Sequence, residues 1–208
     1  MKPKSSKPIY NITTIFFDAG GVLVEDYVDR KVMDLARKYN KSPEQMLILR
    51  RQLRLLADLG HISDQEFWIK ILQAVGVKAV VEDCRIDLYE KAITGSIEIA
   101  KRLKQKGYCL AILSNDTKES SEVRRINYNF DQIFDELIYS YQLGLIKPDP
   151  EIFKVALKRL NAHPKQSLLI DDRIENIESS RNLGINSILF THIDLLVEKL
   201  KVFGINLD

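Results

Sequence analysis

Residues 16–24 read FFDAGGVLV, and they contain the most informative break in the sequence. An apolar run ends there on a single carboxylate, Asp18, and the chain passes at once into Gly20 and Gly21. A solvated aspartate in a turn is the simplest interpretation of this pattern in isolation. The residues elsewhere in the chain determine whether Asp18 has a chemical role instead.

The composition is that of an ordinary globular protein. The 208 residues are 45% apolar and 29% charged, with a net charge of +2, which suits one buried core with a small inserted subdomain. The basic residues 1–7 are predicted to form a disordered tail rather than an arm that binds nucleic acid. No segment approaches the roughly 20 apolar residues of a membrane span. We therefore expect no nucleic-acid partner and no membrane partner.

The cysteines and the N-terminal sequence bear on the cellular compartment. Cys84 and Cys109 are predicted to be free thiols in a reducing environment. Residues 9–13, after the basic tail, do not form the continuous apolar segment that a secretory signal contains. These two features predict a cytoplasmic protein.

Five short runs rich in β-branched and aliphatic residues are predicted to be strands. They are residues 12–18, 108–114, 136–140, 167–171 and 186–190. Most of them are continuously apolar rather than alternating, which is typical of strands covered on both faces in a parallel sheet. Because helical segments separate the runs, the sequence predicts a doubly wound, Rossmann-like α/β sheet with right-handed crossovers.

The helices are indicated by apolar spacing and by the residues at their ends. Asp149 and Pro150 form a start signal, since aspartate suits an N-cap and proline suits the first helical turn. Gly107 and Gly184 are typical of residues just beyond a helix end.

The segment 27–94 contains helix signals but no convincing strand. Capping-box patterns begin at Ser42 and Ser63, and apolar residues follow each of them at helical spacing. We therefore predict a helical cap at 27–94, inserted into an α/β core that is formed by 8–26 and 95–208.

Polar residues stand where the predicted strands end, and ligands bind beyond the carboxyl ends of open parallel sheets. In chain order these residues are Asp18, Ser114, Asn115, Lys147 in the loop after the third strand, Asp171 and Asp172. The adjacent carboxylates Asp171 and Asp172 repel each other, and a bound cation relieves that repulsion. The sequence thus places carboxylates, a hydroxyl group and one lysine at a single edge of the sheet.

Four motifs occur in an order that resembles the haloacid dehalogenase-like (HAD) hydrolase superfamily. They are FFDAGGVL at 16–23, LAILSN at 110–115, GLIKPDPEIF at 144–153 and LLIDDRIENI at 168–177. The helical insertion lies where that family has its cap. The stretch GHISDQEFW at 60–68 looks like the subgroup of sugar-phosphate phosphatases and of the N-terminal phosphatase domain of soluble epoxide hydrolases.

The resemblance implies that Asp18 is a nucleophile that attacks phosphorus and forms an acyl-phosphate. It also implies a Mg²⁺ ion held by Asp18, Asp172 and the backbone carbonyl of Gly20, which reduces the repulsion between nucleophile and phosphate. Lys147 would supply a positive charge to the phosphate, and Ser114 a hydrogen bond.

The resemblance assigns supporting roles to further residues at the same edge. Gly20 and Gly21 would let backbone N–H groups approach the phosphate without a Cβ in the way. Asn115 would also contact the substrate. Asp171 would orient a metal-bound water or the lysine, and Asn176 would act behind the metal ligands.

The chain departs from the family at Gly20, where most phosphatases of this family carry a second aspartate as general acid and base. Such a group commonly contributes about 10²–10⁴ in rate. Three explanations remain open. The first is that another group replaces the aspartate, namely Glu25, Asp26 or a metal-bound water. The second is that the substrate has a good leaving group and needs less help. The third is that the protein has lost turnover and only binds phosphate compounds.

The sequence therefore predicts a Mg²⁺-dependent phosphomonoesterase that acts on a small phosphorylated metabolite, with a sugar phosphate as the first choice. One alternative is a 2-haloacid dehalogenase, which also uses an aspartate nucleophile but needs no metal, so that the paired Asp171 and Asp172 argue against it. The other is a non-catalytic phosphate-binding protein, which Gly20 alone supports. The substrate stays open, as does the choice between a monomer and a homodimer.

Several residues of the predicted cap are assigned structural roles. Trp68 is predicted to lie in the core of the cap, and His61 away from the site. Arg50, Arg51 and Arg54 are predicted to form a solvated helix face rather than to meet an anionic substrate.

Overall fold

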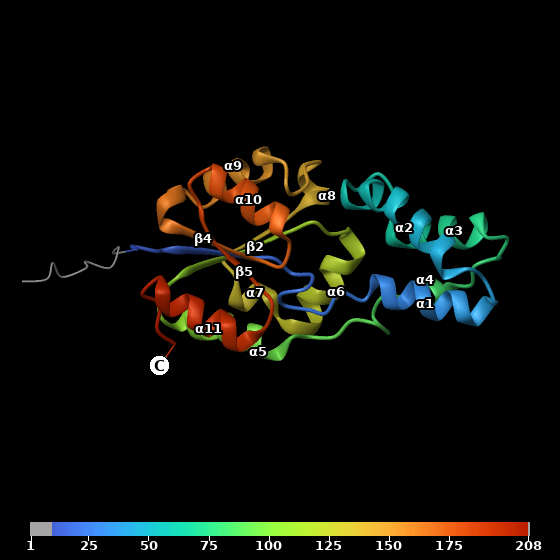
Figure 1. Ribbon diagram of the computed structural model, residues 1–208, viewed down its shortest axis with the longest axis horizontal. Helices are drawn as coiled ribbons and strands as arrows, with labels where there is room; N and C mark the ends of the chain where they lie inside the picture. Colours follow the sequence, from blue (N-terminus) through green and yellow to red (C-terminus); the bar gives the residue numbers. More distant parts are fainter. Residues whose placement is uncertain (1–9, 208) are drawn as a thin grey trace, which may run out of the picture.

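The computed structural model describes residues 10–207, so the predicted tail at 1–7 lies outside the described residues (Figure 1). Its five strands form one parallel sheet in the order β3-β2-β1-β4-β5. The strands are β1 (Thr14–Phe17), β2 (Cys109–Ser114), β3 (Glu136–Tyr139), β4 (Ser167–Asp171) and β5 (Asn186–Leu189). β1 is therefore central, with β2 and β4 as its neighbours.

The predicted doubly wound α/β sheet is confirmed. All five predicted strands are present, and each end differs from its predicted position by two residues at most. Phe17 pairs with Ile112 of β2 and with Ile170 of β4. This register brings the residues that follow the three strands to one edge of the sheet.

Helices connect the strands and surround them. They are α1 (Val28–Tyr39), α2 (Pro43–Asp58), α3 (Asp64–Ala74), α4 (Val81–Cys84), α5 (Thr94–Gln105), α6 (Lys118–Tyr128), α7 (Phe130–Ile133), α8 (Ser140–Leu143), α9 (Pro150–Arg159), α10 (Ile174–Asn182) and α11 (Ile193–Val202). A short 3₁₀ helix, η1 (Pro164–Gln166), precedes β4.

Helices cover both faces of the sheet (Figure 1). Ile15 and Phe17 of β1 join an apolar cluster that includes residues of α5, α7 and α11. Phe16, which lies between them in the strand, joins a different cluster with residues of α9 and α10. Because successive side chains of a strand point to opposite faces, β1 contributes to the core on both sides of the sheet.

The helices α1–α4 form a third apolar cluster at one end of the molecule (Figure 1). Phe67 and Trp68 of α3 are buried in it, with ring centroids 5.0 Å apart. The prediction that Trp68 belongs to a core is therefore confirmed. The segment has the helical character that was predicted for a cap, while its division from the rest of the chain at 27–94 stays a prediction.

The chain enters and leaves these helices through two adjoining segments. Val24 and Ala92 form an antiparallel bridge. On either side of it, the N–H of Glu25 donates to the carbonyl of Lys91 at 2.8 Å, and the N–H of Ile93 donates to the carbonyl of Leu23 at 2.8 Å. The two connections therefore form a short hydrogen-bonded ribbon.

The helix starts follow the predicted capping chemistry in most places. Ser63 and Glu66 form a complete capping box at α3. Asp149 caps α9, with Pro150 as its first residue. Ser42 accepts the N–H of Gln45, but the reciprocal half of the predicted capping box is absent there. None of the helices in the described part of the chain has the length and apolar character that a membrane span requires.

The cluster of α1–α4 contains a completely buried lysine, Lys31. Its Nζ donates to the carbonyl of Arg85 at 2.7 Å and lies 4.2 Å from the centroid of the Trp68 ring. Burial lowers the pKa of Lys31 from 10.5 to about 8, although nearby carboxylates act in the opposite direction. The charged form of Lys31 therefore destabilises the fold.

We expect Lys31→Met to raise the free energy of unfolding at pH 7 by about 1–3 kcal/mol, because it removes a buried charge. The native lysine loses its proton near pH 8 and the unfolded lysine near 10.5. Between these values the unfolded state binds more protons, so wild-type stability rises relative to the variant. Urea unfolding at pH 7 and pH 10 measures the difference. If the free energy of unfolding of the variant exceeds that of wild type by the same amount at both pH values, this account is wrong.

Candidate active site

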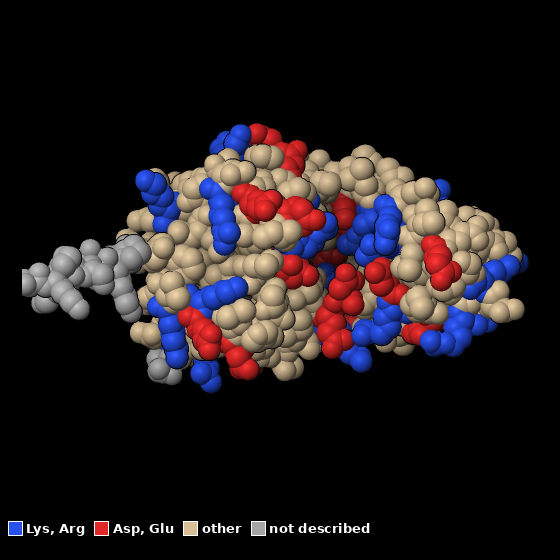
Figure 2. Space-filling view, viewed as in Figure 1, with Lys and Arg blue, Asp and Glu red and all other residues tan. Residues whose placement is uncertain are grey.

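A pocket of about 140 Å³ lies at the carboxyl ends of β1, β2 and β4. Figure 2 shows it as a hollow between the sheet and the helices α1–α4, with acidic and basic side chains at its rim. The lining residues are Asp18, Gly20, Asp26, Tyr27, Val28, Arg50, Arg54, Asp58, Ser114, Asn115, Asp116, Ser120, Arg124, Lys147, Asp172, Arg173 and Asn176. The predicted site residues Asp18, Gly20, Ser114, Asn115, Lys147 and Asp172 are thus brought together.

Asp18 directly follows β1, and its carboxylate is buried. Asp18 Oδ1 accepts the N–H of Ala19 at 2.7 Å and lies 3.0 Å from Lys147 Nζ. Burial raises the pKa of the Asp18 carboxyl, while the charge of Lys147 and a hydrogen bond from Ser114 act to lower it. The lysine therefore favours the ionised form, which is the form that can attack an electrophile.

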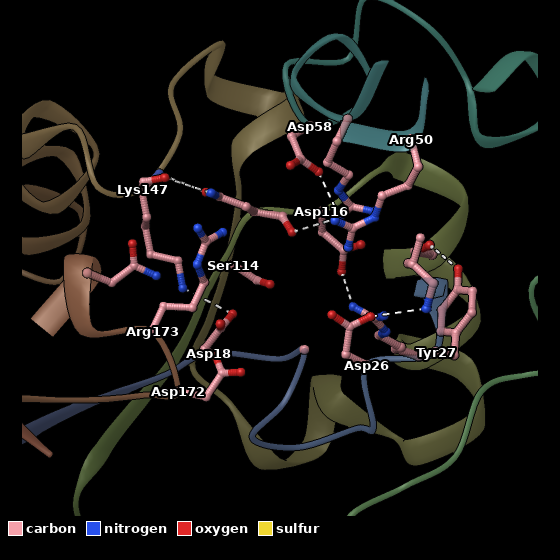
Figure 3. Close-up of a pocket in the computed structure, with 17 residues that line it drawn as sticks. Asp18, Asp26, Tyr27, Arg50, Asp58, Ser114, Asp116, Lys147, Asp172 and Arg173 are labelled. Atoms are coloured by element: carbon pink, nitrogen blue, oxygen red, sulfur yellow. Dashed lines mark hydrogen bonds and ion pairs between the residues drawn. The ribbon is translucent and has the colours of Figure 1, made fainter. Parts of the chain in front are cut away.

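Lys147 is itself buried between two carboxylates (Figure 3). Its Nζ lies 2.6 Å from Oδ2 of Asp171, the last residue of β4, in addition to its contact with Asp18. Burial alone would lower the pKa of Lys147, but the charges of Asp171 and Asp18 outweigh it and raise the pKa. The ammonium group is therefore a fixed positive charge beside Asp18.

Asn115 holds the backbone of Lys147. Its Nδ2 donates to the Lys147 carbonyl at 2.8 Å, and its Oδ1 accepts the Lys147 N–H at 2.7 Å. These bonds use one N–H and one acceptor position of the amide, and a contact of Asn115 with substrate stays a prediction. Asn115 joins the end of β2 to the loop that carries the lysine.

Three carboxylates meet at the ends of β1 and β4. Asp18, Asp171 and Asp172 each offer an oxygen atom, and these atoms lie within 4.8 Å of one another. Burial and the charges of Asp18 and Asp171 raise the pKa of Asp172 to about 6. Two of the three carboxylates are compensated by Lys147, which leaves Asp172 facing Asp18 without a cation of its own.

The donor set fits a small divalent cation. Mg²⁺ prefers oxygen ligands and is usually held by one or two carboxylates together with water and substrate oxygens. Asp171 is occupied by Lys147 and by Asn176, whose Nδ2 lies 2.9 and 3.0 Å from its two oxygens. Asp18 and Asp172 therefore remain as ligands. The Oδ1 atom of Asn176 is buried without a partner among the described residues, which suits a hydrogen bond to a water of such an ion.

The two glycines after Asp18 have different roles. Gly21 has a φ of +75°, and a Cβ at this position would lie 2.1 Å from Asp172 Oδ2. Its N–H donates to the carbonyl of Val24 at 2.7 Å, so the predicted approach of this N–H to a phosphate is wrong. Gly21 makes room for Asp172 instead. Gly20 lines the pocket, and no atom lies within 4 Å of a Cβ built there.

The structure separates the two candidates for the missing acid. Glu25 pairs with Arg30 at 2.9 Å and does not line the pocket. Asp26 does line it, and its Oδ1 accepts the N–H of Val28 at 3.0 Å. Asp26 is therefore the better placed of the two. His61 is exposed and lies outside the pocket lining, as predicted.

The prediction for the arginines of α2 is only partly right. Arg51 is exposed, but Arg50 and Arg54 line the pocket and are mostly buried. The sequence pattern could not distinguish them, because the face of α2 that meets the pocket is set by packing against distant segments.

Sequence analysis missed a buried ion-pair network at the pocket wall. Arg124 Nη1 lies 2.6 Å from Asp116 Oδ2, and its Nε lies 2.9 Å from Glu90 Oε1. Asp116 follows the predicted site residues Ser114 and Asn115 directly, and this adjacency was the one available signal. Its partner Arg124 comes from α6, and Glu90, the second partner of Arg124, comes from the segment before α5. No local pattern indicates either contact.

Gly21→Ala tests the close approach of Asp172. We expect it to lower the free energy of unfolding by about 1–3 kcal/mol, because the positive φ strains an alanine and its Cβ displaces the carboxylate. Gly20→Ala is the matched control, since its Cβ enters open space, and a change within about 0.5 kcal/mol is expected. Urea unfolding of both variants gives the comparison. An equal decrease in the free energy of unfolding for Gly21→Ala and Gly20→Ala would contradict the assigned role of Gly21.

Comparisons with known proteins agree with this architecture. Residues 12–184 match the family model described as haloacid dehalogenase-like hydrolase. D-ribitol-5-phosphate phosphatase of Bacteroides thetaiotaomicron is 27% identical over 191 residues, which cover 85% of this chain and 90% of that protein. (S)-2-haloacid dehalogenase 4A of Burkholderia cepacia is 26% identical over 187 residues, or 83% of this chain and 80% of that protein.

Other similarities are more partial. Bifunctional epoxide hydrolase 2 of Rattus norvegicus is 36% identical over 97 residues, and the match spans 45% of this chain but only 18% of that protein. A HAD-family enzyme of Bacteroides thetaiotaomicron, solved with magnesium and inorganic phosphate, superimposes with a TM-score of 0.69 at 23% identity, covering 86% of this chain and 94% of that one. Because the family model matches most of its length, the chain belongs to the haloacid dehalogenase-like hydrolase family.

Proposed function

We propose that this hydrolase is a Mg²⁺-dependent phosphomonoesterase that acts on a small phosphorylated metabolite through an aspartyl-phosphate at Asp18. The observation that carries the proposal is the cluster of Asp18, Asp172 and Lys147. The carboxylate oxygens of the two aspartates lie within 4.8 Å of each other, and a buried ammonium group lies 3.0 Å from Asp18. A pocket of about 140 Å³ suits a small substrate, since pockets for drug-sized ligands span roughly 300–1,000 Å³.

The proposed reaction has two steps. In the first, the Asp18 carboxylate attacks phosphorus, the bond from phosphorus to the ester oxygen breaks, and the alcohol leaves with a proton from an acid. In the second, water attacks the acyl-phosphate, which releases inorganic phosphate and restores Asp18. Lys147 and Ser114 stabilise the charge that builds up on the phosphoryl oxygens.

A divalent cation is the proposed cofactor, with Asp18 and Asp172 as its side-chain ligands. The Gly20 carbonyl is the third proposed protein ligand. When bound, Mg²⁺ would reduce the repulsion between the anionic nucleophile and the anionic phosphate. One relative is named as a sugar-alcohol phosphatase, and a structural neighbour was solved with magnesium and phosphate, which is consistent with this assignment.

Asp26 is the proposed general acid and base in place of the aspartate that Gly20 lacks. Asp26 lines the same pocket as Asp18, whereas Glu25 is paired with Arg30 outside it. Both Cys84 and Cys109 are free thiols, and this supports the further proposal that the enzyme works in the reducing environment of the cytoplasm.

A 2-haloacid dehalogenase is the second candidate, because a relative of nearly full coverage carries that name. Such an enzyme needs no cation between its carboxylates. Asp172, which faces Asp18 and is not compensated by Lys147, therefore favours the phosphatase.

Asp18→Asn is expected to lower the release of phosphate from p-nitrophenyl phosphate by at least about 10³-fold, because it removes the nucleophile. EDTA is expected to abolish wild-type turnover, and excess Mg²⁺ to restore it. Asp194→Asn, a carboxylate on the exposed side of α11, is the control and keeps full activity. Release of chloride from 2-chloropropionate that persists in EDTA would contradict the proposal and favour the dehalogenase.

Asp26→Asn is expected to lower kcat for an alkyl ester such as glycerol 3-phosphate by roughly 10²-fold. The loss with p-nitrophenyl phosphate should be much smaller, because that leaving group departs without a proton. Gly20→Asp introduces a carboxylate into open space and is expected to restore activity to Asp26→Asn.

Glu25→Gln is the control for this pair and leaves kcat unchanged. If Asp26→Asn lowers kcat equally for both esters, or if Gly20→Asp does not restore its activity, Asp26 has a structural role instead.

A further inference from the structure

Two arginines of α2 line the pocket together with Asp18 and Lys147. Arg50 and Arg54 lie four residues apart and therefore on the same side of the helix. Their side chains are mostly buried, with exposed fractions of 21% and 27%. Figure 3 shows Arg50 extending from α2 toward the middle of the pocket, across from Asp18.

The other guanidinium groups of the pocket wall are neutralised within the protein. Arg54 Nη2 lies 2.8 Å from Oδ1 of Asp58, whose side chain is 11% exposed. Arg124 contacts Asp116 and Glu90 at 2.6 and 2.9 Å, and both carboxylates are almost completely buried. Neither arginine therefore needs an anion from outside.

Arg50 differs from both. Its one ion-pair partner among the described residues is Asp29, whose Oδ1 lies 3.2 Å from Arg50 Nε and whose side chain is 66% exposed. Its charge also acts on Asp58, which already pairs with Arg54. The two terminal nitrogens of the guanidinium group are left without a described partner. A guanidinium fork of this kind binds a carboxylate or a phosphate through two parallel hydrogen bonds. Because Arg50 is partly buried and its only ion-pair partner is exposed, an anion in the pocket would be favourable.

The phosphoryl group that Asp18 attacks has its own partners at the opposite end of the pocket. Lys147 and Ser114 lie beside Asp18, with the proposed cation between Asp18 and Asp172. The lining carboxylates Asp58 and Asp116 are paired with Arg54 and Arg124. Asp26 lies beside Tyr27 and away from Arg50 in Figure 3. Arg50 therefore faces the part of the substrate that departs as the alcohol.

We propose that the substrate carries a second anionic group, a carboxylate or a second phosphate, and that Arg50 binds this group with Arg54 beside it. The inference rests on the proposed phosphatase activity and names its substrate class. The substrate is then a small phosphorylated acid or a bisphosphate rather than a neutral sugar phosphate.

Pairs of phosphate esters that differ in this one group test the proposal. The carboxylate arm compares 3-phosphoglycerate with glycerol 3-phosphate, and 6-phosphogluconate with glucitol 6-phosphate. The second-phosphate arm compares fructose 1,6-bisphosphate with fructose 6-phosphate. Initial rates of phosphate release with Mg²⁺ give kcat/KM for wild type, Arg50→Gln and Arg51→Gln. Arg51 is the matched control, because it is exposed on the same helix.

In at least one pair, wild type is expected to favour the doubly anionic ester in kcat/KM by roughly 10- to 100-fold, the effect of one charged hydrogen-bonded contact. Arg50→Gln should remove most of that preference and change kcat/KM for the neutral ester less than about threefold. Arg51→Gln should leave both values unchanged. Thermal unfolding of Arg50→Gln verifies that the variant is folded.

Two results would overturn the inference while leaving the phosphatase intact. One is an equal kcat/KM for both members of every pair. The other is an equal loss for both members in Arg50→Gln, which would place Arg50 on the transferred phosphate. If no ester releases phosphate, the proposed function fails instead. Calorimetric titration of wild type with each pair in Mg²⁺ then decides the inference separately, and equal affinities would refute it.

Discussion

The ammonium group of Lys147 is the interaction on which the site depends. Asp18 and Asp171 end two neighbouring parallel strands, and both carboxylates are buried. Two buried negative charges at this distance are unfavourable unless a cation lies between them. Lys147 reaches both oxygens from a third segment, and the side chain of Asn115 fixes the backbone of that segment at two points. The lysine therefore joins the ends of three strands.

The same arrangement explains why a further cation suits the site. Lys147 provides one positive charge for three carboxylates, and Asp172 is the carboxylate it does not touch. The absence of a Cβ at Gly21 lets Asp172 approach the turn after β1. Burial, and after it the repulsion from Asp18 and Asp171, raises the pKa of Asp172. A counter-ion would relieve this repulsion, and perturbed carboxylates of this kind are common in binding sites.

The fold and the centre of the site could be predicted from the sequence because the signals are local. Continuous apolar runs identified the strands, and the carboxyl ends of parallel strands lie at one edge of the sheet. The resemblance to the family then placed Asp18 near Asp172. The contacts that were not foreseen depend on the folded backbone, one within a single turn and one between distant segments. The Gly21 N–H and the Asn115 amide are occupied by Val24 and Lys147. Periodicity likewise could not show that Arg50 lines the pocket while Arg51 faces solvent, because the two are adjacent in one basic stretch that was predicted to be solvated.

The short ribbon formed by residues 23–25 and 91–93 carries a consequence for how such enzymes diversify. Because the chain departs from β1 and returns toward α5 through neighbouring segments, the two ends of the segment between them lie together whatever its length. A different helical bundle can be spliced there with the strand order and the three carboxylates left in place. New selectivity can therefore arise in evolution with Asp18, Lys147 and Asp172 in place, because Asp26, Arg50 and Arg54 change together with the exchanged segment.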